Sequence, residues 1–141
     1  MKYYHGTEKL NDKFIIGPPP SIDINKGGGE IGKGFYTTND EWIAIAWAIG
    51  RFGKDEASVL EIDLEDKNRT SLAFTIMLIK TQREVIKIWK KLKKKKQTRT
   101  FEFGYDIVNA PFATIDAARQ YKFESKKAET ILNSSSIKKI L

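Results

Sequence analysis

The sequence predicts a single α+β domain, because strand-like and helix-like stretches share 141 residues, a length typical of one domain with its own core. Residues 58–64 and 119–124 alternate apolar and polar side chains, which is the period of a half-buried strand. Residues 42–49 are apolar without interruption and predict a helix buried on most of its sides. Residues 85–92 carry apolar side chains at the spacing of an amphipathic helix.

The N-terminal part predicts one strand followed by a long loop. Residues 2–5 are expected to form the strand, and Gly6 and Thr7 to turn out of it. Residues 11–29 are expected to be irregular, because three consecutive prolines cannot lie in a helix interior or a central strand. A loop of this length inside a compact domain is usually functional or mobile, and a plain surface insertion is the alternative.

The central part predicts a strand that leads directly into a helix. Residues 35–37 are aromatic and β-branched, which favours a strand. Thr38 and Glu41 have the capping-box spacing just before the apolar run, so we expect the helix to begin there. Gly50 and Gly53 are expected to end it.

The C-terminal half adds further elements. Residues 72–96 predict a helix, and residues 103–111 a strand that ends at proline. Ser125 is expected to cap a helix that runs to about Leu132. Residues 137–141 are compatible with a closing strand or a frayed tail.

Strand alternation within residues 119–124 places three polar side chains on one face, with two aromatic side chains toward the core. The polar residues are Gln120, Lys122 and Glu124. We expect Glu124 to behave as an ordinary surface charge.

Composition excludes several kinds of site. The chain has no cysteine, which excludes disulfides, thiolate nucleophiles and zinc–cysteine centres, and its single histidine excludes a multi-histidine metal site. No apolar run approaches the roughly 20 residues of a membrane span, and the N-terminus has no signal-peptide pattern. We therefore expect a cytoplasmic protein with no membrane partner and no metal.

The net charge of +7 is local, because six lysines within residues 90–96 account for all but +1 of it. Cations at a helix C-terminus complement the helix dipole, which is a sufficient structural explanation. Contact of Lys90–Lys96 with nucleic-acid phosphates is the functional alternative.

Two short patterns bear on ligand binding. Gly27, Gly32 and Lys33 fit most of a phosphate-loop motif, but Gly34 stands where the motif needs Ser or Thr and strand-like residues follow, so we reject it. His5 is either a half-buried residue bonded to the backbone or a polar hook for a ligand at a strand end.

Four motifs in order resemble the ADP-ribosyltransferase superfamily, in the His–Tyr–Glu clade related to diphtheria toxin and the poly-ADP-ribose polymerases. They are H-G-T at residues 5–7, an acidic residue with G-K-G-F-Y-T-T at residues 30–38, Y-D-I-V-N-A-P at residues 105–111 and Q-Y-K-F at residues 120–123. The chain looks closest to a bacterial family of small uncharacterised domains of this kind. The resemblance implies a split β-sandwich of about six strands with a few flanking helices.

The resemblance also implies a binding site for NAD, used as a substrate. His5 matches the histidine that bonds a ribose hydroxyl, Gly6 the glycine whose backbone engages the nicotinamide carboxamide, and Tyr36 the tyrosine that stacks on the nicotinamide ring. Further NAD contacts are implied for Thr7, Gly34, Phe35 and Trp47.

The third catalytic position departs from the family pattern. The family usually has a glutamate, which stabilises the cationic transition state, and Gln120 stands there in this chain. A glutamine orients the ribose but supplies no charge. Either Gln120 suffices, or Glu30, Asp116 or Glu124 supplies the charge.

The resemblance implies an ADP-ribosyltransferase acting on a protein, DNA or RNA acceptor, in the setting of a bacterial toxin or phage-defence effector with an antitoxin or other neutralising partner. NAD glycohydrolysis is the enzymatic alternative. A catalytically silent module that binds nucleic acid through the lysine run is the alternative from another class.

Overall fold

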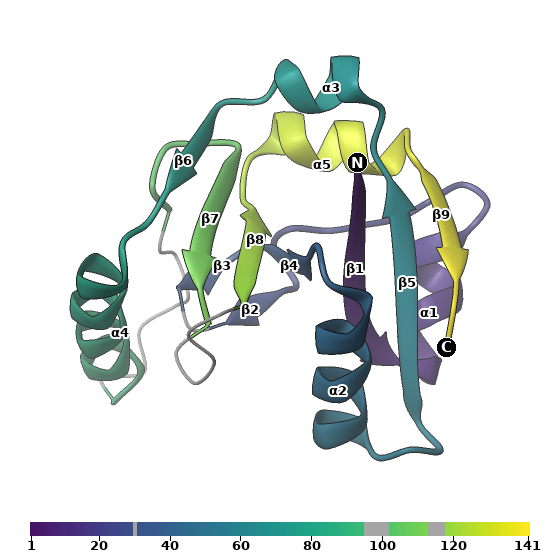
Figure 1. Ribbon diagram of the computed structural model, residues 1–141, viewed down its shortest axis with the longest axis horizontal. Coiled ribbons are helices and arrows are strands. Elements are labelled where there is room, and N and C mark those ends of the chain that lie inside the picture. The colour runs from purple at the N-terminus through teal and green to yellow at the C-terminus, as the bar shows by residue number, and fades with distance from the viewer. Residues whose placement is uncertain (30, 95–101, 113–117) are drawn as a thin grey trace.

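The computed structural model describes residues 1–29, 31–94, 102–112 and 118–141 and has an α+β fold (Figure 1). The strands are β1 (Lys2–Glu8), β2 (Gly28–Gly29), β3 (Gly32–Lys33), β4 (Phe35–Thr38), β5 (Ala57–Asp63), β6 (Phe74–Ile76), β7 (Ile107–Pro111), β8 (Arg119–Phe123) and β9 (Ser136–Lys139). The helices are α1 (Lys9–Ile16), α2 (Glu41–Phe52), α3 (Asp66–Thr70), α4 (Ile79–Lys94) and α5 (Lys126–Asn133). The α+β prediction is confirmed.

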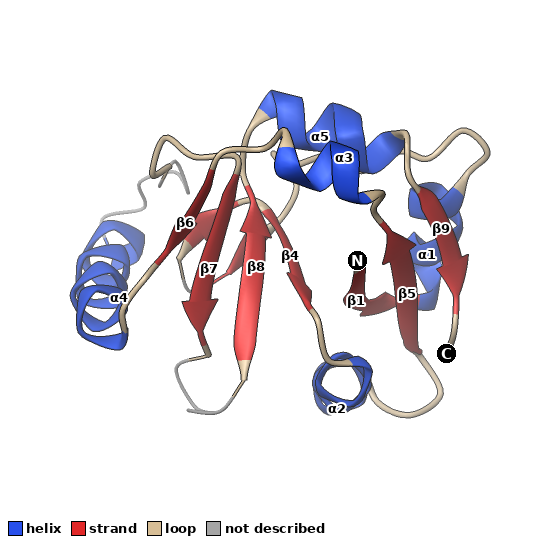
Figure 2. Cartoon of the chain, turned by 45° about the horizontal axis from the view of Figure 1, so that its top comes forward, coloured by secondary structure: helices blue, strands red, loops and turns tan. Residues whose placement is uncertain are grey.

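Seven strands form one mixed sheet in the order β6-β7-β8-β4-β1-β5-β9, and β2 pairs with β3 in a separate two-stranded sheet. β6 and β7 are parallel, whereas the other neighbours in the large sheet are antiparallel. β1 pairs with β5 over seven residue pairs, but with β4 over the single pair Tyr4↔Thr38. The sheet is therefore joined only narrowly between β4 and β1, and Figure 2 shows these two strands diverging.

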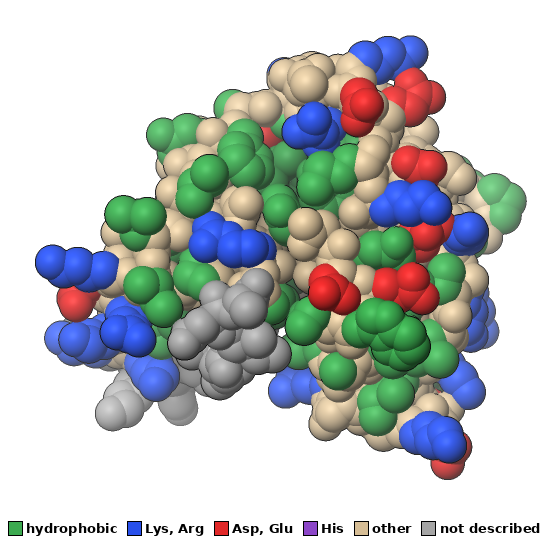
Figure 3. All heavy atoms as spheres, viewed as in Figure 1, with side chains coloured by type: hydrophobic (Ala, Val, Ile, Leu, Met, Phe, Trp, Pro, Cys, Tyr) green, Lys and Arg blue, Asp and Glu red, His purple; other side chains and the backbone are tan. Residues whose placement is uncertain are grey.

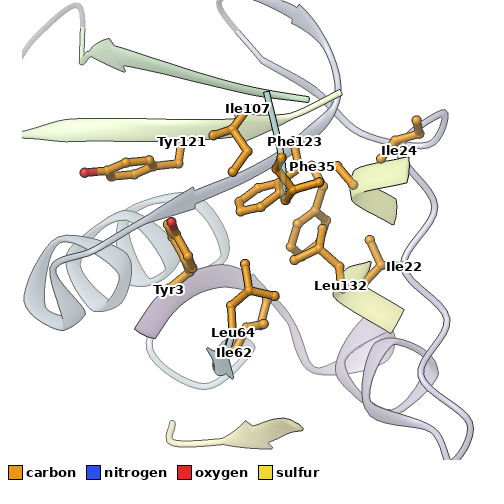
Figure 4. Packing of buried hydrophobic residues seen from close by; sticks show 12 residues of the cluster. Tyr3, Ile22, Ile24, Phe35, Ile62, Leu64, Ile107, Tyr121, Phe123 and Leu132 are labelled. Carbon is orange, nitrogen blue, oxygen red and sulfur yellow. The ribbon is translucent and has the colours of Figure 1, made fainter. Parts of the chain in front are cut away.

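A core of aromatic and aliphatic side chains joins the two parts of the sheet. The Tyr3 ring of β1 meets the Tyr121 and Phe123 rings of β8 edge to face, with centroids 5.3 Å and 5.2 Å apart (Figure 4). Leu132 of α5 is fully buried in the same cluster. Edge-to-face contacts add to the burial of these rings. The halves are thus held together beneath α5, while β1 and β4 separate elsewhere.

The N-terminal prediction was partly wrong. β1 continues through Gly6 and Thr7 to Glu8, because these residues pair with β5. Residues 9–16 form α1, and all of them from residue 11 onwards lay in the predicted irregular stretch. The loop after α1 is tied to α5: Asn133 bonds both the backbone N–H and the carbonyl of Ile22, and Glu129 accepts from the N–H of Ile24.

The helix after β4 differs from its prediction in two ways. Asp40 is the N-cap and accepts from the N–H groups of Trp42 and Ile43, while Thr38 accepts from the N–H of Asp40. The helix is also not buried on most sides, since Trp42 is 77% exposed and only Ala44 and Ala48 are buried. Figure 3 shows hydrophobic side chains gathered at the surface over α2. One apolar face packs on β1 and β5, and the rest of the apolar run remains in solvent.

Gly53 caps the C-terminus of α2 with a positive φ, as predicted, but Gly50 lies inside the helix. The Ser125 cap and its helix are confirmed, with Ser125 accepting from the N–H of Ala128. Residues 136–139 form the closing strand β9.

Three further predictions were confirmed only in part. β5 is buried on both faces over residues 57–62, because α1 and α2 lie on opposite sides of it. Residues 72–96 were predicted as one helix, but β6 precedes α4 and the residues after 94 lie outside the described part. The strand predicted for residues 103–111 is confined to β7.

Candidate functional site

A cavity of about 750 Å³ lies where β1 and β4 separate. Its walls come from β1, β2, β4, α1, α2 and the loop between α1 and β2, together with Phe112 just after β7 and Gln120 of β8. Pockets that bind small molecules commonly measure about 300–1,000 Å³. The cavity therefore has the size of a small-molecule binding site.

The cavity is lined by all eight residues to which the resemblance gives a catalytic or NAD-binding role. They come from four separate elements or the turn beside one, and they are His5, Gly6 and Thr7 of β1, Gly34, Phe35 and Tyr36 at β4, Trp47 of α2, and Gln120 of β8.

His5 is held through one edge and one face of its ring. Its Nδ1 lies 2.6 Å from the carbonyl oxygen of Tyr36, and its ring stacks on Phe35 with centroids 4.1 Å apart. Because a carbonyl can only accept, Nδ1 carries the proton and Nε2 is the acceptor of the neutral ring. Burial lowers the pKa of His5 to about 4, with the bond to Tyr36 opposing the shift. Both sequence interpretations of His5 therefore describe one arrangement: a backbone-bonded ring that also lines the cavity.

Gly6 lies where α2 comes closest to β1. A Cβ at this position would be 2.8 Å from the Trp47 ring and 3.1 Å from the carbonyl oxygen of Ala44. The absence of a side chain allows the helix to pack against the strand and sets the position of Trp47, which is 49% exposed at the cavity.

Tyr36 is fixed by the glycine segment that the phosphate-loop pattern covered. Its hydroxyl donates to the carbonyl oxygen of Gly32. A Cβ at Gly29 would lie 2.7 Å from the tip of the Tyr36 ring, so the Gly29 backbone packs directly on the ring. Gly29 lines the cavity beside Tyr36, and Gly28 and Gly29 pair with Lys33 and Gly32 as two short strands.

Gln120 is buried, 3% exposed, and its Nε2 donates to the carbonyl oxygen of Pro111 at 3.0 Å. This bond fixes the rotation of the side-chain amide. Gln120 pairs with Thr38 of β4, so it stands at the narrow join between the two parts of the sheet.

Glu124 was expected to be a surface charge and is not one. It is 4% exposed, its Oε1 lies 3.0 Å from Lys122 Nζ, and its Oε2 accepts from the N–H groups of Phe103 and Gly104. Lys122 is fully buried, so the polar face predicted for β8 is covered. Glu124 is not among the lining residues, whereas the other two candidate acids, Glu30 and Asp116, lie outside the described residues.

Sequence reasoning missed the wall that α1 and the following loop contribute. Asn11 and Phe14 of α1, and Asp23 and Lys26 of the loop, all line the cavity. Among the lining residues that the structure describes, Asp23 carries the only carboxylate and Lys26 the only ammonium group. The length of the proline-containing loop was the one available signal, because it favoured a functional loop.

The lysine run lies outside this cavity. Lys90 and Lys91 are exposed at the C-terminal part of α4, whereas residues 95 and 96 are outside the described residues. In the part of the chain that the structure describes, no helix has both the length and the apolar character needed to cross a bilayer. No protein-family model and no curated protein matches this chain.

Proposed function

We propose that this protein is an NAD-dependent ADP-ribosyltransferase with the split β-sandwich that its sequence motifs imply. One observation carries the proposal: the eight residues to which the resemblance gives catalytic or NAD-binding roles, spread from position 5 to position 120, line a single cavity between two parts of a narrowly joined sheet. Cavity size and lining chemistry are both compatible with a dinucleotide.

The lining groups suit the parts of NAD. His5 Nε2 accepts a hydroxyl hydrogen bond from a ribose, which requires the neutral ring that its lowered pKa maintains. Lys26 is exposed at the cavity and, within the described residues, has no carboxylate partner in an ion pair, so it is available to the pyrophosphate. Tyr36 and Trp47 supply aromatic surface for the bases.

The proposed reaction breaks the bond between nicotinamide and ribose C1′. Nicotinamide leaves with the bonding electron pair, positive charge develops on the sugar, and the acceptor's nucleophilic atom forms the new bond to C1′ while its proton passes to solvent. Charge development at C1′ resembles that in glycoside hydrolysis. Gln120 orients the ribose through its fixed amide, and Asp23 is the described lining residue that brings a negative charge to the cavity.

The same site supports water as an acceptor, which is the NAD glycohydrolase alternative. The acceptor distinguishes the two activities, since both release nicotinamide. The setting proposed for the transferase is that of a bacterial toxin or phage-defence effector, and its expression in a bacterial host is expected to arrest growth in a manner that depends on His5 and Gln120.

The proposal is tested by incubating the protein with NAD labelled in the adenosine part and following nicotinamide and labelled products. Pools of protein, DNA and RNA are supplied separately as acceptors. Label on one macromolecular pool supports the transferase, and free ADP-ribose alone supports the glycohydrolase. His5→Ala should lower turnover at subsaturating NAD by at least about tenfold, equivalent to about 1.4 kcal/mol. Absence of nicotinamide release in every pool contradicts the proposal.

A further inference from the structure

The positive charge of the chain is concentrated on α4 and the residues that follow it. Residues 79–99 contain ten Lys and Arg residues and one acidic residue, a net charge of +9, so the rest of the chain carries −2 of the total +7. The five described basic side chains of α4 are all exposed, and we call them the basic stripe: Lys80, Arg83, Lys87, Lys90 and Lys91.

The helical repeat places the basic stripe on one side of α4. Successive members of the stripe are one, three or four residues apart in the sequence. Because a helical turn contains 3.6 residues, these side chains lie on one broad face of the helix. Gln82 and Val85 lie on the other face and are buried. Within the described residues, the stripe has one ion pair, Lys87 with Glu84 at 3.4 Å, and an exposed pair of this kind contributes little. The stripe is therefore an almost uncompensated row of cations.

α4 stands at one end of the molecule, beyond the edge of the sheet (Figures 1 and 2). Lys and Arg side chains gather over it in Figure 3. A protruding helix with cations along its outer face is accessible to a long, regularly charged partner.

The inner face of α4 reaches the candidate catalytic position. Gln82 Nε2 and Gln120 Nε2 both donate to the carbonyl oxygen of Pro111, at 2.5 Å and 3.0 Å. A carbonyl oxygen has two lone pairs and can accept both bonds. Because a helix with its side chains is about 10–12 Å across, the basic stripe lies roughly one helix diameter from the carbonyl that orients Gln120.

We infer that α4 docks the phosphodiester backbone of a nucleic acid through the basic stripe. This inference rests on the proposed function, and it makes nucleic acid the class of acceptor that the transferase modifies. Repeating phosphates match a row of cations and release counterions on binding. A membrane surface is disfavoured as the partner because a helix that lies in a membrane needs a continuous apolar face. Val85 of α4 is buried against the protein, so Ile79 and Ile88 are the exposed large apolar side chains among the described residues of this helix.

The inference is tested by fluorescence anisotropy without NAD, using labelled single-stranded DNA, single-stranded RNA and duplex DNA over a series of salt concentrations. The stripe variant is Arg83→Gln with Lys87→Gln and Lys90→Gln. The control, Lys9→Gln with Lys54→Gln and Lys67→Gln, removes the same charge from exposed positions elsewhere. The stripe variant should lower the salt slope by roughly 2–3 and weaken binding at least about tenfold, and the control should stay close to the parent protein.

The inference is overturned if both variants lose the same affinity for nucleic acid, or if the protein binds no nucleic acid. Equally strong binding of polyglutamate or of anionic lipid vesicles also overturns it in favour of an acidic protein or a membrane. The arms that use DNA and RNA identify which nucleic acid docks. Because binding is measured without NAD, a protein that binds nucleic acid but releases no nicotinamide contradicts the proposed function alone. A transferase that labels only protein and ignores nucleic acid contradicts this inference alone.

Discussion

His5 illustrates how one side chain serves both the fold and the candidate site. β1 and β4 share a single residue pair, and the bond from His5 Nδ1 to the Tyr36 carbonyl provides a second link between these strands one residue further along. That bond also fixes the tautomer, so Nε2 is left as an acceptor. The sequence singled out His5 as a candidate by its position before glycine. The Tyr36 carbonyl and the Phe35 ring come from a strand about thirty residues away, which periodicity does not locate.

The lowered pKa of His5 predicts a dependence of stability on pH. The folded value of about 4 lies below the ordinary 6.5, so the unfolded chain binds the proton more tightly. This contribution to the free energy of unfolding is fully present above about pH 6.5 and is lost as the pH falls towards about 4. Its total is about 3 kcal/mol. Urea unfolding of the protein and of His5→Gln across this range measures it: the two free-energy curves should converge as the pH falls. Parallel curves would show that His5 does not titrate as described.

NAD binding provides an independent check on the same residue. If Nε2 accepts from a ribose, the affinity for NAD should stay constant through the region around pH 6.5 where an ordinary histidine titrates. A decline in affinity centred near pH 6.5 that disappears in His5→Gln contradicts the assignment.

Gln120 yields a second prediction, because its amide donates to a carbonyl. Gln120→Ala should abolish nicotinamide release, since it removes the group that orients the ribose. In Gln120→Glu the introduced carboxyl would face the Pro111 oxygen in a buried position, where the protonated form is favoured. Its turnover should therefore be low near neutral pH and rise as the pH rises. Single-turnover nicotinamide release across pH tests this, and a parent-like rate in folded Gln120→Ala removes Gln120 from the mechanism.

At the level of elements, β8 shows which features of a strand follow from the alternation of apolar and polar residues and which do not. The alternation of residues 119–124 correctly indicated a strand with Tyr121 and Phe123 in the core. It also suggested a solvated opposite face, yet Lys122 and Glu124 are buried. The cover is non-local, because Phe103 and Gly104 bond to Glu124 and the Lys122 ammonium lies 4.9 Å from the Phe103 ring centroid.

The buried pair predicts a large stability effect away from the cavity. Glu124→Ala leaves the Lys122 ammonium buried without its carboxylate and removes the acceptor for two backbone N–H groups, so it should cost about 3–5 kcal/mol. Glu65→Ala is the control, because its exposed pair with Lys67 should contribute only about 0–1 kcal/mol. Chemical denaturation measures both. A loss at Glu124 as small as that at Glu65 means that the pair contributes no net stability.

For the whole molecule, the sequence predicted most elements and the candidate site residues, but not their arrangement. The α+β class, the β4–α2 succession and the Ser125 cap follow from local patterns. The narrow join between β1 and β4 depends on which strands pair, and no local pattern contains that information. The exposed apolar run of α2 was misassigned for the same reason: an apolar stretch indicates burial only if another surface covers it, and the cavity lies beside this helix.

The core beneath α5 holds together two parts of a sheet that share one residue pair, so weakening this core should affect both stability and the cavity. Tyr3 belongs to one part, its partners Tyr121 and Phe123 to the other, and Tyr3 is 1% exposed. Tyr3→Ala should cost about 3–5 kcal/mol, as large-to-small changes of buried aromatic residues do. It should also weaken NAD binding in the folded fraction, since the cavity walls come from both parts.

Tyr105→Ala is the matched control, because Tyr105 is 42% exposed and the stability lost in this variant should stay within about 0.5 kcal/mol. Thermal and urea unfolding with NAD titration test this pair. If Tyr3→Ala is destabilised but binds NAD like the parent protein, the core supports folding without setting the separation of β1 and β4.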